Sequence, residues 1–334
     1  MDQFDIFRTP IKPLEVTKKI GYEDKVMLLG SCFTNNIGSR LSQNLFNTLI
    51  NPLGILYNPS SIMSLLDRII DKNLLNDSDI SWLGNSYGSF EFHSDFNDRS
   101  VELSLSKINR AIERAHEYLK SCQHLFITFG TAYIYEHKMT GRVVGNCHKQ
   151  PEKEFKRFRL SPNDIIMEWA NLLKRIWDLN PNLQVTLTVS PIRHLRDGHV
   201  ENQLSKASLL LAVDRLRQGF SERNIGYFPT YEIMMDDLRD YRFYDKDMVH
   251  PSELAIDYIW SLYSNTYFDD STRQLIKEIN KIVKSANHRP NDTTSESHQK
   301  FIKKQLDKIE VISKRCPAID LDEIIHQFRQ NLHE

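Results

Sequence analysis

Short apolar runs alternate along this chain with longer amphipathic segments, and this alternation limits the folds open to it. Three runs have the length and composition of strands buried on both faces: Lys25–Leu29, His124–Phe129 and Leu183–Val189. Each is followed by a small residue at which a turn can begin, namely Gly30, Gly130 or Ser190. The pattern predicts an α/β protein built on a parallel sheet.

Helical periodicity fills the stretches between and after these runs. The predicted helices span residues 34–46, 60–71, 104–120, 162–179, 202–223, 251–267 and 272–285. Those between the strands are long enough to cross back over a sheet, so we expect a three-layer α/β/α sandwich. Residues 87–96 alternate like a β-ribbon, and residues 132–144, broken by Met139-Thr140-Gly141, are typical of a hairpin. We interpret both as insertions.

The end of the chain differs in composition from the rest. We predict a main domain over residues 1–285, a polar linker over 286–299 and a helical extension over 300–334. The helices expected in that extension, 300–314 and 319–332, form a charged hairpin with a partial apolar stripe. The stripe fits either docking onto the main domain or association with a partner.

Charge and hydropathy restrict the surroundings of the protein. Its 43 Lys and Arg balance 44 Asp and Glu, which argues against general nucleic-acid binding. No apolar stretch approaches the ~20 residues of a membrane span. Residues 1–24 carry charges throughout, which argues against a secretory signal, and the 4 cysteines form no C-x-x-C pair. We therefore expect a cytoplasmic protein with reduced thiols.

Several common catalytic signatures are missing from the sequence. It contains no G-x-x-x-x-G-K-[ST], no G-x-G-x-x-G after a strand, no H-E-x-x-H and no G-x-S-x-G. These absences argue against standard ATPases, dehydrogenases, metalloproteases and α/β-hydrolases. We expect neither a metal ion nor an organic cofactor.

A hydroxyl nucleophile fits the end of the first strand. Ser31 follows Gly30 and precedes a predicted helix, so it is expected at the carboxyl edge of the sheet beside a positive helix end. Free backbone N–H groups there can stabilise an oxyanion. The alternative is that Ser31 only caps the helix. Cys32 is a competing nucleophile, although a residue at this position can equally point into the core.

A possible general base lies before the last helix of the predicted main domain. Asp247 stands three residues ahead of His250, a spacing that lets the carboxylate bond to Nδ1 and leaves Nε2 free to accept a proton. Pro251 suits the first turn of the following helix, which would place His250 near its N-terminal cap. The alternative is a surface acid and a capping histidine.

Four sequence blocks together carry a family resemblance. They are Gly30-Ser31-Cys32-Phe33-Thr34, Asn146-Cys147-His148-Lys149, Ser190-Pro191-Ile192-Arg193-His194 and Asp247-x-x-His250-Pro251-Ser252. From about Thr9 to Tyr267 the chain resembles the GSCFA domain family of the SGNH/GDSL hydrolase-like superfamily. The resemblance implies a flavodoxin-like α/β/α domain and a Ser-His-Asp triad that hydrolyses esters.

Carried over, the resemblance makes Ser31 the nucleophile, His250 the general base and Asp247 its orienting acid. It also implies an oxyanion hole formed by the N–H of Ser31, the N–H of Gly54 and an asparagine side chain. The chain departs from the superfamily here, because Gly130-Thr131-Ala132 lacks the asparagine. Asn146 can supply the amide from another direction, or it can be a simple turn residue.

Other residues are candidates for substrate contact. Arg193, His194 and His148 are assigned to this role, with Arg193 paired to a nearby carboxylate as the alternative. We expect Lys206 to be solvated on an amphipathic helix. Aromatic side chains that can line a sugar site are Tyr133, Tyr135 and Trp82, although most aromatic residues are expected in the core.

The main functional hypothesis is a serine esterase that removes a short-chain acyl group, such as O-acetyl, from a small molecule or carbohydrate. Acyl transfer to another hydroxyl in the same fold is one alternative. A non-catalytic module that binds an acylated or carbohydrate ligand is the second, and an interaction protein acting through its C-terminal helices is the third.

Overall fold

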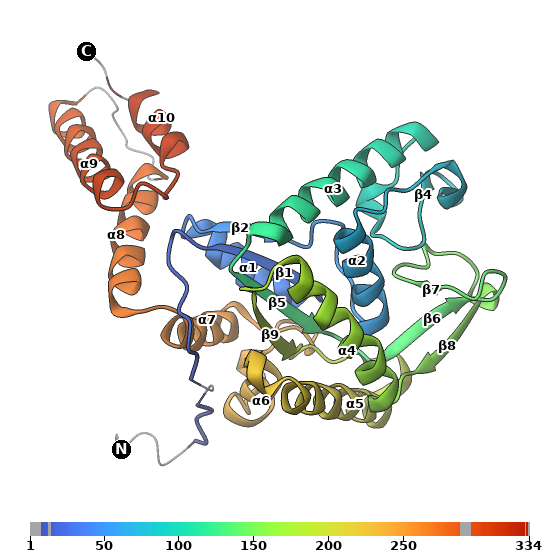
Figure 1. Cartoon of the computed structure of the whole chain (residues 1–334). Helices are drawn as coiled ribbons and strands as arrows, with labels where there is room; N and C mark the ends of the chain where they lie inside the picture. Colours follow the sequence, from blue (N-terminus) through green and yellow to red (C-terminus); the bar gives the residue numbers. More distant parts are fainter. Residues whose placement is uncertain (1–7, 13–14, 288–294, 331, 333–334) are drawn as a thin grey trace.

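The computed structural model describes residues 8–12, 15–287, 295–330 and 332. Its centre is a parallel five-stranded sheet of order β10-β9-β5-β1-β2 (Figure 1). The strands are β1 Lys25–Gly30, β2 Asn47–Ile50, β5 His124–Phe129, β9 Gln184–Val189 and β10 Gly226–Tyr227. The three predicted strands form the middle of the sheet, and this strand order is the flavodoxin-like one.

Side chains alternate between the two faces of the sheet and define two hydrophobic clusters. Met27 and Leu29 belong to the cluster under one helical layer, whereas Val26 and Leu28 belong to the other. The first layer consists of α2 Pro59–Asp71, α3 Val101–Ser121, α4 Pro162–Leu179 and α5 Gly198–Gly219. The second consists of α1 Cys32–Gln43 and α7 Glu253–Tyr267, and α8 Asp270–Ala286 continues the same hydrophobic cluster toward α9 and α10. The predicted three-layer α/β/α fold is therefore confirmed.

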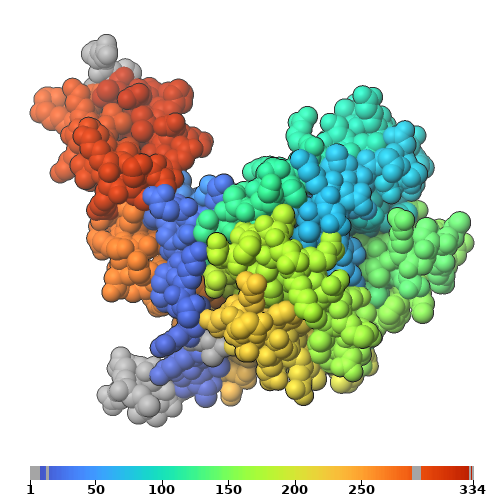
Figure 2. Space-filling view, viewed as in Figure 1, coloured from blue at the N-terminus to red at the C-terminus, as the bar shows by residue number. Residues whose placement is uncertain are grey.

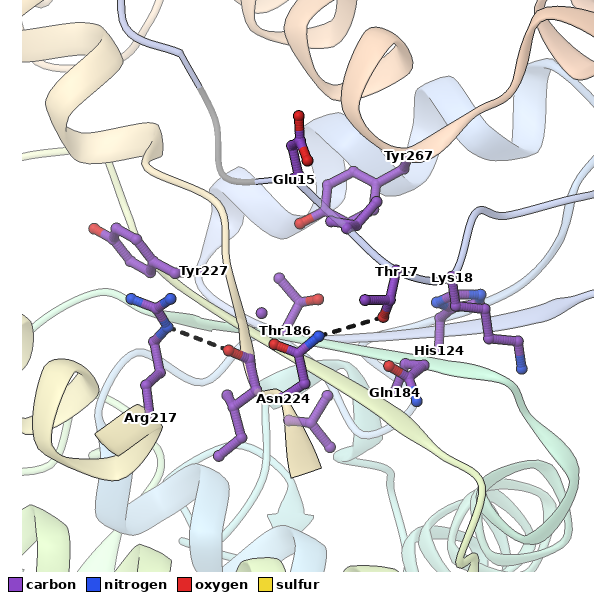
Figure 3. A pocket seen from close by; sticks show the side chains of 14 residues that line it. Glu15, Thr17, Lys18, His124, Gln184, Thr186, Arg217, Asn224, Tyr227 and Tyr267 are labelled. Carbon is purple, nitrogen blue, oxygen red and sulfur yellow. Dashed lines mark hydrogen bonds between the residues drawn. The ribbon is translucent and has the colours of Figure 1, made fainter. Parts of the chain in front are cut away.

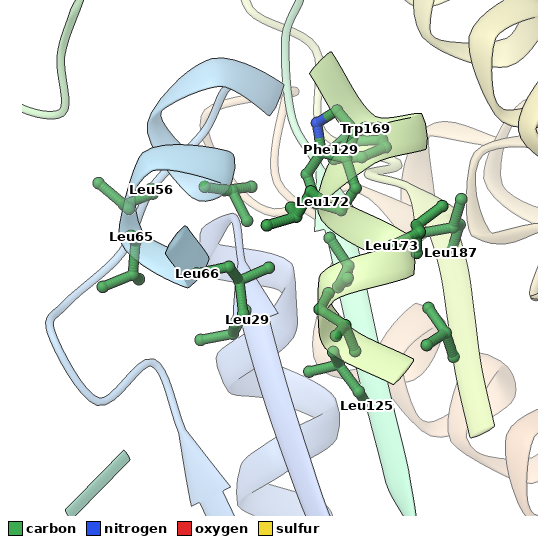
Figure 4. Packing of buried hydrophobic residues seen from close by; sticks show 14 of the residues in the cluster. Leu29, Leu56, Leu65, Leu66, Leu125, Phe129, Trp169, Leu172, Leu173 and Leu187 are labelled. Carbon is green, nitrogen blue, oxygen red and sulfur yellow. The ribbon is translucent and has the colours of Figure 1, made fainter. Parts of the chain in front are cut away.

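Close packing holds the first layer on the sheet. Leu29, Leu125 and Leu187 from three strands meet Leu66 of α2 and Leu173 of α4, all buried (Figure 4). Local signals start these helices where the sequence predicts: Asn58 accepts from the N–H of Ser61 at 2.8 Å, and Ser161 and Asp164 form a capping box.

One predicted insertion is confirmed and the other is wrong. β6 Tyr133–His137 and β7 Val143–Val144 form the expected hairpin, and β8 Phe155–Arg159 pairs with the other edge of β6. No ribbon spans residues 87–96, because the N–H of Phe92 bonds to the carbonyl of Ser89 and turns the chain. Only β4 Tyr87–Gly88 pairs there, with β3 Ser81–Trp82.

The remaining elements complete the second layer and the end of the chain. A short helix, α6 Thr230–Glu232, runs into a π-helical turn at Ile233–Asp237. α9 Glu296–Arg315 and α10 Asp322–Gln330 project from one end of the molecule (Figure 2). Half of the predicted linker, residues 288–294, lies outside the described residues.

The predicted apolar stripe of the C-terminal extension is partly used within the chain. Ile309 and Ile312 of α9 and Phe328 of α10 are buried in the hydrophobic cluster that includes α8. Phe301 stays 37% exposed. Among the described residues, no helix combines the length and apolarity needed to cross a bilayer.

Candidate active site

A cavity of about 650 Å³ opens at the carboxyl ends of the strands. The segments after β1, β2, β5 and β9 line it, together with the hairpin insertion and the loop before α7. Its lining residues are Cys32, Ile55, Tyr57, Asn58, His93, Thr131, Tyr133, Tyr135, Val144, Gly145, Asn146, Cys147, Arg157, Ile192, Arg193, His194, Leu195, Arg196, Val249 and His250. This is the edge at which open α/β sheets bind ligands.

A second cavity lies at the opposite, amino-terminal edge, beside His124, Gln184 and Gly226 (Figure 3). Its volume is only about 40 Å³. Two of the polar side chains around it are already paired, as Arg217 donates to the carbonyl of Ile225 at 3.2 Å and Asn224 to the hydroxyl of Thr17 at 3.3 Å. The larger cavity is therefore the candidate active site.

Asp247 and His250 form the predicted pair in the loop before α7. Asp247 Oδ2 lies 2.5 Å from His250 Nδ1, while its Oδ1 accepts from the N–H groups of Val249 and His250 at 2.9 Å each. These backbone donors, followed by the imidazole, lower the pKa of Asp247 to about 2. The carboxylate thus holds the ring with Nε2 facing away from it.

The expected position of Pro251 in the first helical turn is wrong. α7 begins at Glu253, and Ser252 is its N-cap, with its hydroxyl accepting from the N–H of Ala255 at 3.4 Å. Pro251 instead makes a β-bridge with Tyr244. Because Ser252 takes the capping role, His250 is held by its loop rather than by the helix end.

His250 faces Cys32 and not Ser31. Its Nε2 lies 3.9 Å from Cys32 Sγ, which lines the cavity. The Ser31 side chain is completely buried, and its Oγ has no hydrogen-bond partner within the described residues. The structure therefore does not bring together the predicted pair of Ser31 and His250. The side-chain atom close to Nε2 is instead the sulfur of Cys32.

The tight end of β1 explains why Ser31 points inward. Gly30 has a φ of 130°, and a Cβ there would lie 2.2 Å from the carbonyl oxygen of Thr128 on β5. The N–H of Ser31 donates to the same oxygen at 3.2 Å, which keeps Ser31 against the sheet. Cys32 is the first residue of α1 and turns toward the cavity.

Opposing influences act on the Cys32 thiol. Burial raises its pKa, whereas the N–H groups of Cys32 and Phe33 and the cation of Lys206 act in the lowering direction. The net shift is upward, so the resting group is a thiol that requires a base. His250 Nε2 is the nearest base, and the start of α1 supplies a positive helix end.

The predicted oxyanion donors have different outcomes. The N–H of Ser31 already donates to the carbonyl oxygen of Thr128 at 3.2 Å, and the N–H of Gly54 donates to that of Asn51 at 2.8 Å. Asn146 lines the cavity, and its Oδ1 accepts from the N–H of His148 at 2.8 Å, which directs Nδ2 elsewhere. Within the described residues, that Nδ2 has no protein acceptor, so it is available to an oxyanion.

Two of the three predicted substrate-contact residues line the cavity. Arg193 and His194 do so, whereas His148 is not a lining residue and its Nε2 lies 2.9 Å from the carbonyl oxygen of Ser89. Burial, followed by Lys206 and other nearby cationic groups, lowers the pKa of His194 to about 4, so His194 is neutral at pH 7. Arg193 has no carboxylate within ion-pair distance in the described part of the chain.

The expectation that Lys206 is solvated is wrong. It is fully buried, and its Nζ donates to the carbonyl oxygens of Gly130 and Ser190 at 2.7 Å each. Asn202 and Ser205 bury polar groups on the same face of α5 and bond to the N–H groups of His194 and Ala132. Asn202, Ser205 and Lys206 are spaced i, i+3 and i+4, so they lie on one face of α5. Three polar residues on one face of a helix that covers a sheet were the sequence signal that could have predicted a buried polar role for Lys206.

The aromatic candidates are also divided. Tyr133 and Tyr135 line the cavity, and Tyr57 joins them. Trp82 is 57% exposed and packs edge-on against Tyr87, away from the cavity. Among the described residues, no group of three or more His, Cys, Asp or Glu side chains is arranged to hold a metal ion.

Two family models match the sequence. The GSCFA family matches residues 25–263, and the C-terminal domain of GSCFA domain proteins matches residues 279–334. A search of curated proteins finds no match.

Solved structures similar to this chain include three with low identity. A carbohydrate esterase family 3 protein from Talaromyces cellulolyticus is 11% identical with a TM-score of 0.36, covering 76% of this chain and 99% of its own. A putative acylhydrolase from Bacteroides fragilis is 12% identical with a TM-score of 0.36, and the match covers 80% of this chain and 92% of the acylhydrolase. An acetyl xylan esterase from Butyrivibrio proteoclasticus is 11% identical with a TM-score of 0.36, and the match covers 78% of this chain and 65% of the esterase.

Proposed function

The chain belongs to the GSCFA family, and we propose that it is an acyl hydrolase that uses Cys32, His250 and Asp247 to cleave a carboxylic ester. One observation carries the proposal: Cys32 Sγ lies 3.9 Å from an imidazole nitrogen whose ring is fixed by a carboxylate. A nucleophile, a base and an orienting acid in this order form a catalytic triad. The proposal replaces Ser31 with Cys32 as the nucleophile.

The chemistry follows from the positions of these groups. His250 Nε2 takes the thiol proton as Cys32 Sγ attacks the ester carbonyl carbon. The oxyanion so formed accepts a hydrogen bond from Asn146 Nδ2. Collapse of the intermediate breaks the bond to the alcohol, which leaves with the proton held by His250. Water then attacks the thioester, releases the acid and restores the thiol.

Two alternatives use the same cavity. If an alcohol replaces water in the second step, the enzyme is an acyltransferase with the same nucleophile. The burial of Ser31, taken alone, would favour a module that binds its ligand without cleaving it. The proposal favours an enzyme because Cys32 places a nucleophile beside His250, and a binding module has no need of one. We also propose a cytoplasmic location, because a nucleophilic thiol is kept active in reducing surroundings.

The test compares neighbouring nucleophiles. Hydrolysis of short-chain aryl esters is measured for the wild type, Cys32→Ala, Cys32→Ser and Ser31→Ala, after circular dichroism shows that all four are folded. Loss of a triad nucleophile costs up to ~10⁶-fold in kcat, so Cys32→Ala is expected to be inactive while Ser31→Ala retains turnover. Trapping the acyl group on the peptide that contains Cys32, identified by mass spectrometry, provides an independent measurement.

Each other outcome assigns a different role. Activity in Cys32→Ala together with inactivity in Ser31→Ala returns the nucleophile to Ser31. A trapped acyl-enzyme that turns over only when an alcohol is added identifies the acyltransferase. A wild type that neither hydrolyses nor becomes acylated supports the non-catalytic module.

A further inference from the structure

The cavity next to Cys32 is basic. Arg157, Arg193 and Arg196 line it, and its described lining residues include no aspartate or glutamate. We propose that the ester substrate carries an anionic group, a carboxylate or a phosphate, close to its acyl bond, and that Arg193 binds this group. The inference rests on the proposed function and adds the substrate class to it.

Two of the three arginines already have carboxylate partners, neither of which lines the cavity. Arg157 bonds to Asp197, and Arg196 Nη2 lies 2.7 Å from Glu152 Oε1. Aromatic rings hold them as well, since the Arg157 guanidinium lies 4.0 Å from the centre of the Tyr133 ring. These two arginines therefore build the wall of the cavity.

Arg193 differs from both, because its guanidinium has no carboxylate partner within the described residues. Its Nη2 lies 2.9 Å from the thioether sulfur of Met235, which is a weak acceptor. A ligand oxygen with negative charge forms a shorter and stronger bond with a guanidinium than a thioether does. An anion in the cavity therefore has one cation available to it that is not neutralised.

The backbone on both sides of Arg193 is fixed. The N–H of Ile192 donates to Ser190 Oγ at 3.3 Å, and the N–H of His194 donates to Asn202 Oδ1 at 2.9 Å. Arg193 follows β9, at the same edge of the sheet as Cys32, and lines the same cavity. Its cation is thus presented by a rigid segment, which lowers the entropy cost of binding.

The position of Arg193 in the cavity allows the anionic group to belong to either part of the ester substrate, the acyl group or the alcohol. Matched ester pairs separate them. In the first pair, para-nitrophenyl succinate, with a free carboxylate on the acyl group, is compared with its methyl ester. In the second, acetylglycerol phosphate is compared with acetylglycerol, so that the charge lies on the alcohol.

We expect kcat/KM to favour the anionic member of one pair by ~10-fold or more, mainly through KM, because one charge-assisted contact is worth ~1.5–3 kcal/mol. Arg193→Gln is expected to remove this preference, measured as the ratio of kcat/KM between the anionic and the neutral member of the same pair. Arg142→Gln, at an exposed position in the hairpin turn away from the cavity, retains the preference. Equal rates for both members of both pairs overturn the inference.

Binding to a variant that cannot turn over separates this inference from the proposed function. Calorimetry with Cys32→Ala measures monomethyl succinate against dimethyl succinate, and glycerol phosphate against glycerol. An anion preference that disappears in the Cys32→Ala, Arg193→Gln double variant supports the anion site even if no ester is hydrolysed. Hydrolysis without any charge preference overturns the anion site and keeps the acyl hydrolase.

Discussion

Lys206 on α5 donates a hydrogen bond of 2.7 Å to the carbonyl oxygen of Gly130, the residue that follows β5. A second bond of equal length reaches Ser190, which follows β9. The N–H of Gly130 is also used, bonding to the carbonyl oxygen of Tyr57 at 2.7 Å. One buried amine therefore ties together two strand ends beside the cavity.

Lys206→Met is expected to destabilise the fold. Methionine keeps most of the packed stem but leaves the carbonyl oxygens of Gly130 and Ser190 without this donor, at a cost of ~1–3 kcal/mol for each. Urea unfolding should show a lower free energy of unfolding than in the wild type. Lys174→Met, at an exposed position on α4, is the matched control. A Lys206→Met protein as stable as this control would contradict a structural role for the two bonds.

The stability contributed by position 206 should depend on pH. Burial lowers the pKa of Lys206 to about 7, whereas in the unfolded chain it is ~10.4. Between these values the unfolded state binds a proton that the folded state lacks, so raising the pH favours folding. The neutral amine still has two hydrogens for its two carbonyl partners.

The difference in unfolding free energy between the wild type and Lys206→Met should therefore increase from neutral to alkaline pH, by up to ~1.4 kcal/mol per pH unit. Denaturant titrations of both proteins across this range measure it. A difference that stays constant with pH would show that Lys206 keeps its proton in the folded state.

Acid destabilisation should involve His124. Burial lowers the pKa of His124 to about 4 against the opposing effect of Asp24, whereas an unfolded histidine titrates near ~6.5. As the pH falls through this window the unfolded state gains a proton first, so stability is lost. His124→Gln should flatten the dependence of melting temperature on pH, and His326→Gln, at an exposed site, should not. Equal slopes in the two variants would contradict the assignment.

Most of the architecture could be predicted from the sequence because long periodic segments report burial directly. The three central strands and the seven main helices follow from the apolar pattern. β2 and β10 have only four and two residues, too short to show a period, and their positions come from pairing with neighbouring strands. Strand order likewise depends on contacts between distant segments.

The site could be located but not assigned in detail. The family resemblance predicted that the end of β1 lies near the loop of Asp247 and His250, and the structure brings these segments together. Which of two adjacent side chains faces the cavity depends on the turn at Gly30, which is set by its close approach to Thr128. Sequence pattern carries no information about that approach, so Ser31 and Cys32 could not be separated.

Asp247→Asn tests how much the orientation of His250 contributes. The Oδ1 atom of the substituted side chain can still accept the two backbone N–H groups, so the loop is expected to keep its shape. At the second position an amide replaces the carboxylate oxygen beside Nδ1 and favours the wrong tautomer. With an aryl ester, kcat should fall by up to ~10⁴-fold with little change in KM. Because the pKa of Asp247 is about 2, its carboxylate is ionised at every pH at which the protein is folded. The loss of kcat in Asp247→Asn should therefore not change with pH.

The control is Asp245→Asn in the same loop, whose carboxylate accepts, among the described residues, only from the N–H of its neighbour Lys246. It should leave kcat within a few-fold of the wild type. Equal activity of the two variants would mean that His250 needs no carboxylate to serve Cys32. Equal inactivity, with native circular dichroism, would assign the loss to the shape of the loop rather than to the imidazole.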